Sequence, residues 1–361
     1  MFGFKGNNSE KKLISLNESR SSKVTSISKY KLAINIALLF IILISTLRYD
    51  VGTDYLGYVD MYNDYGVFNK KIFTIFNEFG FYLIVITGIW IGFSSIWLFF
   101  VFSALSWSLL LKTFKPHLSL LFLIFLILDE RLFWSFSGIR QWLAIAFFVL
   151  SIVKYGNKKY KYFLLYIFMG SLFHTSILFL TPVVLLLDFI PLKFLNKKIV
   201  LLLFFTTLYI GASDELNNLI QNIFLGFAKF IPELSYYTRH IELGRIVNST
   251  ELESIPGIGF WLKRILDLIL IIKIFKHKKE LSKIWIYLLI LGVLYFNLFY
   301  SVEILLRLSL YPLIFRSLLW ARIYQLEKNN YMLVFVFIIY LTIFIAAFIN
   351  GSNQCCPYNF I

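Results

Sequence analysis

The sequence predicts an all-α, polytopic membrane protein with about eleven transmembrane helices. Of its 361 residues, 59% are hydrophobic and only 15% are charged, whereas soluble domains carry about 25% charged residues. The mean hydropathy is +0.76, and the apolar residues come in long blocks, not short periodic ones. Basic residues gather between some of these blocks and acidic residues between others, as expected when Lys and Arg concentrate in cytoplasmic loops.

The amino-terminal part of the chain predicts one crossing followed by an outer loop. Residues 1–29 are polar and basic, so we expect a disordered cytoplasmic tail. The apolar run 30–47 has no small-residue cleavage site after it and is interpreted as a retained anchor. The loop 48–79 carries five acidic residues against three basic ones, which places it outside.

Two apolar runs follow, and only one of them is expected to cross. If both 80–92 and 94–111 crossed, Lys112 and Lys115 would lie outside, against the preference of basic residues for the cytoplasm. The first run is also short for a span, at 13 residues. We therefore predict that 79–92 lies along the outer surface as a juxtamembrane helix, while 94–111 returns to the cytoplasm.

The rest of the chain alternates between the two sides. The run 162–190 has basic residues at both ends, so we expect a hairpin of two short helices that breaks near His174. The segment 212–256 has six acids against three bases and is expected outside, as is the tail 350–361. The eleven predicted crossings are 30–47, 94–111, 118–128, 141–154, the two halves of 162–190, 199–211, 257–275, 284–300, 304–321 and 331–349.

This topology accounts for the strongly basic balance of the chain. A net charge of +15 would suggest nucleic-acid binding in a soluble protein. Here the basic residues belong to the cytoplasmic loops, so no nucleic-acid partner is expected. The predicted organisation is a cytoplasmic tail, 1–29, a transmembrane domain, 30–349, with outer loops at 48–93 and 212–256, and an outer tail, 350–361.

Several function classes are excluded because their motifs are missing. The sequence has no P-loop, no His-Glu-x-x-His motif and no Cys/His metal spacing, so neither a cofactor nor a metal ion is expected. The cytoplasmic loops are too short for an ATPase or nucleotide-sugar domain. An enzyme built this way would take its substrate from the membrane and act on the outer face. The adjacent Cys355 and Cys356 are too few for a disulfide framework.

A polar stretch at the mouth of the first crossing carries Arg48, Asp50 and Asp54. Gly52 and Gly57 are expected to turn the backbone there, because glycine tolerates conformations that other residues resist. Ionisable groups at a membrane boundary are costly and therefore candidates for function. The alternative is an ordinary solvated loop with a belt of tyrosines.

Three further residues are candidates on the outer face. Arg140 opens a predicted span, and a guanidinium added to a helix amino terminus makes an anion site suited to phosphate; the alternative is an arginine that anchors the helix to lipid headgroups. His174 is either a functional group at a helix break or a structural histidine. Arg307 lies inside its span and must meet Glu303, a lipid phosphate or a substrate phosphate.

Four sequence motifs carry most of the candidate residues. They are Arg48-Tyr49-Asp50-Val51-Gly52-Thr53-Asp54-Tyr55 with Tyr58, Glu78-Phe79-Gly80-Phe81, Gly138-Ile139-Arg140-Gln141 and Phe173-His174-Thr175-Ser176. Together these motifs resemble the EpsG family of Wzy-like exopolysaccharide and O-antigen polymerases. The match is clearest after the first crossing and covers most of the chain's length, with weaker similarity at Arg307-Leu308-Ser309-Leu310-Tyr311 and at Pro357-Tyr358.

The resemblance implies a glycosyltransferase that polymerises lipid-linked glycans at the bacterial cytoplasmic (inner) membrane. Such enzymes move a growing chain from undecaprenyl pyrophosphate onto the next lipid-linked repeat unit, during synthesis of O-antigen, capsule or exopolysaccharide. The partners implied are the undecaprenyl-pyrophosphate-linked oligosaccharide, membrane lipids, and a chain-length regulator and a flippase. The outer loop followed by a juxtamembrane helix also resembles the GT-C architecture. A lipid-linked glycan flippase or transporter, and a ligase or single-sugar GT-C transferase, remain the alternatives.

Within this implied reaction the candidate residues receive roles. Asp54, Arg48, Arg140 and His174 are expected to take part in catalysis, and Asp50, Tyr55, Tyr58, Glu78 and Arg307 to bind substrate. Asp54 is expected to be the base. Asp50 would share a face of an extended segment with Arg48, which would favour its charged form and weaken it as a proton acceptor. Tyr55 and Tyr58 are expected to stack on sugar rings near Asp54.

Overall fold

A computed structural model describes residues 28–64, 78–213, 257–300, 303–327, 331–350 and 358–360, with four isolated residues of the segment 214–256. The side chains of Glu303 and Ile304 are not included. Predictions for the tail 1–27, for most of 214–256, and for Cys355, Cys356 and Pro357 therefore lie outside the described residues. The described residues are helical apart from connecting segments and one isolated bridge between Arg48 and Phe360, which confirms the all-α class.

Each predicted crossing coincides with one helix. The predicted break at His174 is also present, because α9 ends and α10 begins on either side of it. These helices are Ser28–Thr46, α5 (Ile96–Lys112), α6 (Pro116–Leu128), α8 (Ile139–Gly156), α9 (Tyr160–Ser171), α10 (Ile177–Phe189), α11 (Lys197–Gly211), α14 (Ile258–Lys276), α15 (Lys283–Phe299), α16 (Glu303–Leu326) and α17 (Tyr331–Ile349). Shorter elements are α2 (Tyr55–Asn63), α4 (Phe79–Ile91), α7 (Arg131–Ser137) and the 3-10 helix η1 (Leu192–Phe194).

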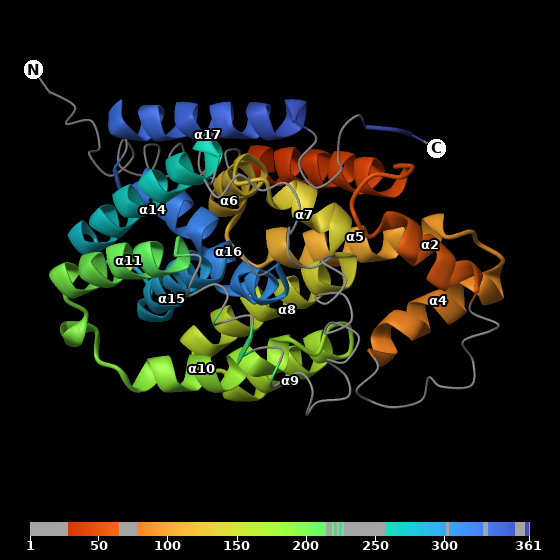
Figure 1. Cartoon of the computed structure of the whole chain (residues 1–361). Helices are drawn as coiled ribbons and strands as arrows, with labels where there is room; N and C mark the ends of the chain where they lie inside the picture. Colours follow the sequence, from red (N-terminus) through yellow and green to blue (C-terminus); the bar gives the residue numbers. More distant parts are fainter. Residues whose placement is uncertain are drawn as a thin grey trace, which may run out of the picture.

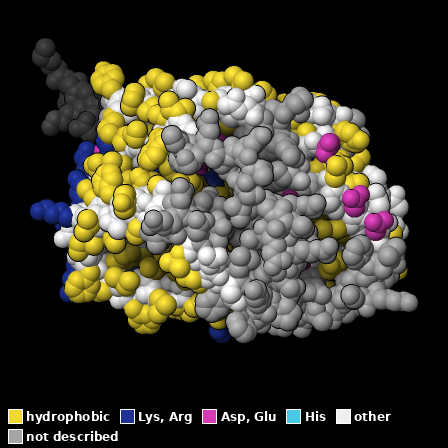
Figure 2. Space-filling view, viewed as in Figure 1, with side chains coloured by type: hydrophobic (Ala, Val, Ile, Leu, Met, Phe, Trp, Pro, Cys, Tyr) yellow, Lys and Arg dark blue, Asp and Glu magenta, His cyan; other side chains and the backbone are white. Residues whose placement is uncertain are grey.

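The long helices lie side by side, and the described residues 358–360 near the carboxyl end lie at the same end of the bundle as α2 (Figure 1). Three described helices, Ser28–Thr46, α8 and α17, are long and apolar enough to cross a membrane, and several shorter apolar helices accompany them. Figure 2 shows hydrophobic side chains over the left half and along the top of the visible face, Lys and Arg at its left edge and acidic residues at its right. The apolar helices indicate a multi-pass membrane protein.

Two helices, α8 and α16, occupy the centre of the bundle. In α8, 67% of the residues are buried. In the most apolar 18 residues of Ser28–Thr46 and of α17, which lie at the periphery, only 22% are buried. The buried rings of Trp142 and Phe148 from α8 and of Tyr311 and Trp320 from α16 belong to the same hydrophobic core. These enclosed helices hold their polar residues in fixed positions, and each carries one of the candidate arginines.

Helix α4 stays at one end of the bundle. Its first turn is tied to the turn before His174, because Gly80 N–H donates to Leu172 O over 2.7 Å. Its later turns pack on the start of α5, where Trp97 Nε1 donates to Ile84 O over 3.1 Å. Beside this contact, a Cβ on Gly88 would lie 2.3 Å from the Trp97 ring. In Figure 1, α4 lies beside α2 at the end where the carboxyl terminus is found.

The expectation of two glycine turns is half wrong. Gly52 has a φ of +97°, in the left-handed region that favours glycine. Gly57 instead lies inside α2, with no atom within 4 Å of a Cβ placed on it. The helix begins directly after Asp54, so only the first glycine turns the chain.

Candidate functional site

The polar stretch after the first helix is folded into a compact loop. Arg48 forms an antiparallel bridge with Phe360, and Tyr49 N–H donates to Asn359 O over 2.9 Å. Asp50 has a φ of +49°, and the loop turns again at the next glycine. Between them, the fully buried Val51 packs against aromatic rings of α7. The loop is therefore held on one side by the end of the chain and on the other by α7.

Gly52 and Thr53 fix the distance between this loop and α7. A Cβ on Gly52 would lie 2.9 Å from Phe136 O, so any side chain would push the loop away. Thr53 N–H donates to Ser137 Oγ over 3.2 Å. As a result Asp54 lies at the start of α2, where its Oδ2 is 3.8 Å from Arg307 Nη1 of α16.

A small open pocket lies between this loop, the α7–α8 turn and α16. Its polar lining includes Asp54, Ser137, Gln141 and Arg307, and its apolar lining includes Trp134 and Trp142. Gln141 Nε2 donates to the backbone oxygen of Arg307 over 2.7 Å, which ties α8 to α16 at the pocket.

Arg140 lies in the first turn of α8 and contacts Glu78. Its Nη1 donates to Glu78 Oε2, and its guanidinium lies over the rings of Tyr58 and Phe81, at 5.6 and 5.1 Å from their centroids. The other carboxylate oxygen of Glu78, Oε1, lies 3.2 Å from His174 Nδ1. One carboxylate thus contacts both the arginine and the histidine that the sequence singled out.

Burial and the two arginines set the charge state of this group. Burial raises the pKa of Glu78, and the positive charge of Arg140 offsets part of that rise. Burial, followed by the positive charges of Arg140 and Arg307, lowers the pKa of His174 to about 3. The imidazole is therefore neutral at physiological pH, and the charge of Arg307 reaches it from α16.

A second tie joins α16 to the His174 turn. The hydroxyls of Ser176 and Tyr311 lie 2.8 Å apart in a hydrogen bond. Tyr311 follows Arg307 by one helical turn, so the same face of α16 contacts the pocket and the turn. Sequence reasoning gave no role to Gln141, Ser176 or Tyr311; their closeness to the candidate residues in the chain was the available signal.

Four sequence-predicted residues lie away from the pocket or are covered. Arg48 is 1% exposed, with its guanidinium 4.7 Å from the Phe99 centroid, and does not line the pocket. Tyr55 stacks on Phe99 at 4.8 Å, and Tyr58 lies under Arg140; both are 4% exposed, so protein covers the rings expected to meet sugars. Asp50 is exposed, and its backbone has the left-handed conformation. The segment from Arg48 to Asp50 is therefore not extended, whereas the prediction for Asp50 required an extended one.

A family model for the EpsG family matches residues 31–360. The chain belongs to the EpsG family. No curated protein and no solved structure matches the chain. The EpsG match runs from the first helix to the bridge at Phe360, so it includes the loop, the pocket and the Glu78, Arg140 and His174 group. EpsG membership indicates a role in exopolysaccharide biosynthesis.

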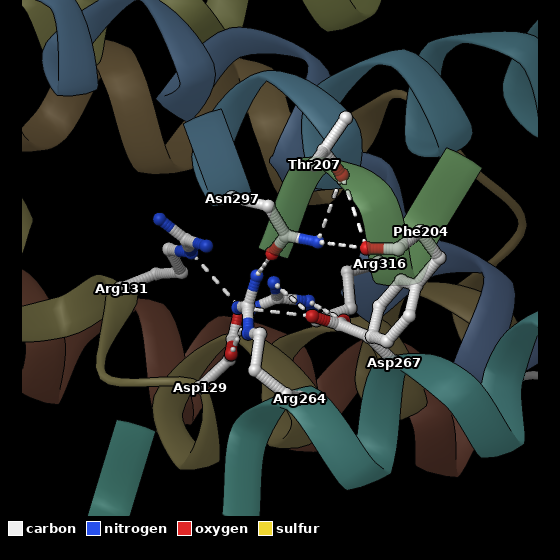
Figure 3. Close-up of polar contacts among 8 residues, drawn as sticks. All are labelled: Asp129, Arg131, Phe204, Thr207, Arg264, Asp267, Asn297 and Arg316. Carbon is white, nitrogen blue, oxygen red and sulfur yellow. Dashed lines mark hydrogen bonds and ion pairs between the residues drawn. The ribbon is translucent and has the colours of Figure 1, made fainter. Parts of the chain in front are cut away.

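This EpsG-family chain also contains a second group of charges, the buried network of Asp129, Arg131, Arg264, Asp267 and Arg316 (Figure 3). Arg316 Nη1 donates to Asp129 over 2.9 Å and Nη2 to Asp267 over 3.1 Å. Asp129 also accepts from Arg131 Nε over 2.9 Å, and Asp267 lies 2.9 Å from Arg264 Nη2. The network joins α6, α7, α14 and α16.

Only two of the three neighbouring charged residues in α14 pair with each other. Arg264 and Asp267 pair with each other, but Lys263 pairs with Glu130 over 2.8 Å, because that carboxylate lies across from it in the α6–α7 turn. Arg264 Nη1 also donates to Asn297 Oδ1 of α15 over 2.6 Å. Arg131 is buried in the network, at 5% exposure.

Proposed function

We propose that the protein is a glycosyltransferase that polymerises lipid-linked oligosaccharide repeat units on the outer face of the bacterial cytoplasmic membrane. It transfers the growing glycan from undecaprenyl pyrophosphate onto the next lipid-linked unit. The observation that carries the proposal is the convergence of Arg140 and Arg307, from the two central helices, on His174, Glu78 and Asp54 at one end of the bundle. EpsG membership supports the same pathway class.

The convergence suits the chemistry of this transfer. A hydroxyl of the acceptor sugar attacks the anomeric carbon, and the bond from that carbon to the phosphate oxygen breaks with its electron pair left on the pyrophosphate. Arginine's planar donors bind such an oxyanion in a two-pronged manner, and fixed cations at the developing charge are worth several kcal/mol. The hydroxyl proton needs a base, which Asp54 or His174 supplies.

The orientation in the membrane follows from the charges. In Figure 2, Lys and Arg gather at the end opposite α2 and α4, which supports a cytoplasmic position for that end. We expect His174 and the loop 48–79 outside, and Lys158 and Lys279 inside. Cysteine labelling of intact cells checks this in a variant without Cys355 and Cys356. Labelling of the Lys158→Cys variant from outside the cell would show that the proposed topology is inverted.

The other partners are part of the proposal. The lipid-linked oligosaccharide enters from the membrane, and no cofactor is used. A flippase acts before the polymerase, and a chain-length regulator acts together with it. The GT-C-like architecture remains a prediction, since no solved structure matches the chain.

A deletion strain tests the function. Surface polysaccharide is separated on a gel, and the strain is complemented with the wild-type gene or with Arg140→Lys. Loss of the ladder with single capped units retained means that polymerisation is the missing step. Loss of all capping would assign the chain to a ligase or a flippase. Purified lipid-linked units should yield polymer in vitro with the wild-type protein alone.

A further inference from the structure

Glu78 is held in a strained conformation at the centre of the site. Its φ is +55°, in the left-handed region, which costs a non-glycine residue about 1–2 kcal/mol. Its carbonyl accepts from Phe81 N–H over 2.9 Å, and the next turn is anchored to Leu172 O through Gly80 N–H. A Cβ on Gly80 would lie 2.7 Å from the Phe173 ring. Strain that the surroundings preserve in this way is typical of functional sites.

The two oxygens of this carboxylate face two different groups. Oε2 accepts from Arg140 Nη1, and Oε1 lies 3.2 Å from His174 Nδ1. Among the described residues, no other carboxylate is within ion-pair distance of both. The anchoring of residues 78–80 to residues 172–173 also fixes the backbone before His174 relative to Glu78. The carboxylate therefore sets how the guanidinium and the imidazole lie relative to each other.

This arrangement selects one form of His174. A carboxylate beside Nδ1 favours the tautomer with its proton on Nδ1, which leaves Nε2 as the proton acceptor. The nitrogen and the oxygen are close but not aligned as a hydrogen bond, and catalytic contacts of this kind commonly tighten when substrate binds. The charges of Arg140 and Arg307 disfavour the imidazolium until an anion compensates them.

We propose that Glu78 is a positioning residue of the transfer: it orients His174 as the proton acceptor and holds Arg140 in place for the pyrophosphate. The inference rests on the proposed function and differs from the substrate-binding role expected for Glu78. When the acceptor oxygen bonds to the anomeric carbon, its proton passes to Nε2 of His174. The resulting imidazolium is stabilised by the Glu78 carboxylate, and the bond to pyrophosphate breaks with its electrons on the leaving group. The imidazolium later returns its proton to water.

The first test is kinetic, with purified lipid-linked units. Glu78→Gln keeps the shape of the side chain but cannot stabilise an imidazolium. We expect kcat to fall at least tenfold with KM changed less than threefold, and the acidic limb of the kcat profile to move to lower pH. Asp54→Asn removes the other candidate base and should leave the position of that limb unchanged, because His174 sets it. An unchanged kcat and limb in Glu78→Gln would overturn the inference, as would a limb that moves only in Asp54→Asn.

The second test needs no activity. The chain has four histidines, so the signals of His174 in ¹⁵N-histidine-labelled protein are identified by their loss in His174→Gln. We expect the Nδ1-protonated tautomer in the wild type and a mixture in Glu78→Gln. If the wild type makes no polymer but its tautomer still changes in Glu78→Gln, the proposed function fails while the positioning role holds. A tautomer unaffected by Glu78→Gln overturns the positioning even where polymer is made.

Discussion

The protein holds two groups of acidic residues and arginines, which differ in how deeply they are buried and in how closely their charges are paired. In the site, the side chains of Asp54, Glu78, Arg140, His174 and Arg307 are between 15% and 39% exposed. In the buried network, no charged side chain is more than 5% exposed. Helix α7 connects them, since it begins at Arg131 of the network and ends at Ser137 of the pocket.

The difference separates a structural role from a working one. A buried network in which each charged residue has an ion-pair partner is difficult to disturb, because removal of one partner leaves another charge buried without compensation. The site instead has one contact of 3.8 Å, a neutral histidine between two cations and a strained backbone at Glu78. Residues arranged in this way can exchange their contacts for a substrate.

The largest effect is expected at the centre of the network. Arg316→Met leaves Asp129 and Asp267 without a main partner, and loss of one member of a buried pair costs about 3–5 kcal/mol. We expect little protein in the membrane and a large drop in the melting temperature of what is purified. Arg140→Met is the matched variant in the site and should keep near-normal stability. Equal stability of the two would remove the distinction between the groups.

Arg140 should affect activity instead of folding. Arg140→Ala and Arg140→Lys are both expected to abolish polymer at unchanged protein level, because lysine lacks the planar two-pronged donor. The loss in rate should be about 10²–10³-fold. Polysaccharide gels and quantitative blots of the same cells measure both quantities. Polymer of normal length from the lysine variant would make Arg140 a lipid anchor.

Two glycines in the same segment provide a smaller contrast. Gly52→Ala should displace the loop from Phe136 and lower activity at least tenfold, because the position combines a φ of +97° with an approach of 2.9 Å. Gly57→Ala lies inside α2 with open space around it and should stabilise that helix slightly, by about 0.5–1 kcal/mol. Melting curves and transfer rates distinguish the two variants. Similar activity in both would indicate that the loop adapts.

The smallest effect concerns pH. His174 has a pKa of about 3 in the folded protein, below its usual 6.5, so between these values the unfolded chain binds a proton that the folded chain does not. The contribution of His174 to stability is therefore full above pH 6.5 and falls as the pH decreases toward 3. Wild-type protein should lose a few °C more between pH 7 and pH 5 than His174→Gln. An identical decrease in both would place the effect elsewhere.

The lengths of the hydrophobic blocks and the side on which the charged residues gather were sufficient to predict the long helices, but not the short helices α2 and α7. They also indicated that 162–190 breaks at His174, where α9 ends and α10 begins. They could not identify lateral neighbours, since charge patterns state which end of a helix a residue occupies but not what lies beside it. Lys263 thus pairs with Glu130 across a helix boundary.

The sequence predicted which residues belong to the candidate site better than it predicted which of them contact one another. The sequence singled out Arg140, His174 and Glu78, and the structure brings them together; their roles remain proposals. Arg48 was expected to act on substrate, but it is covered by aromatic rings because the chain turns sharply after it. Backbone turns of this kind depend on tertiary contacts with α7 and the chain end, which local spacing does not encode.

The contact between the first motif and the last residues has a consequence for biosynthesis. Tyr358 donates its hydroxyl to Ile44 O, 314 positions away, and the bridge beside it closes the loop that carries Asp54. The ribosome makes Tyr358 314 residues after Ile44, so the loop cannot take its final form until helix α17 and the residues that follow it have been made. If the proposed transfer is correct, a nascent chain that has not yet reached residue 360 is inactive.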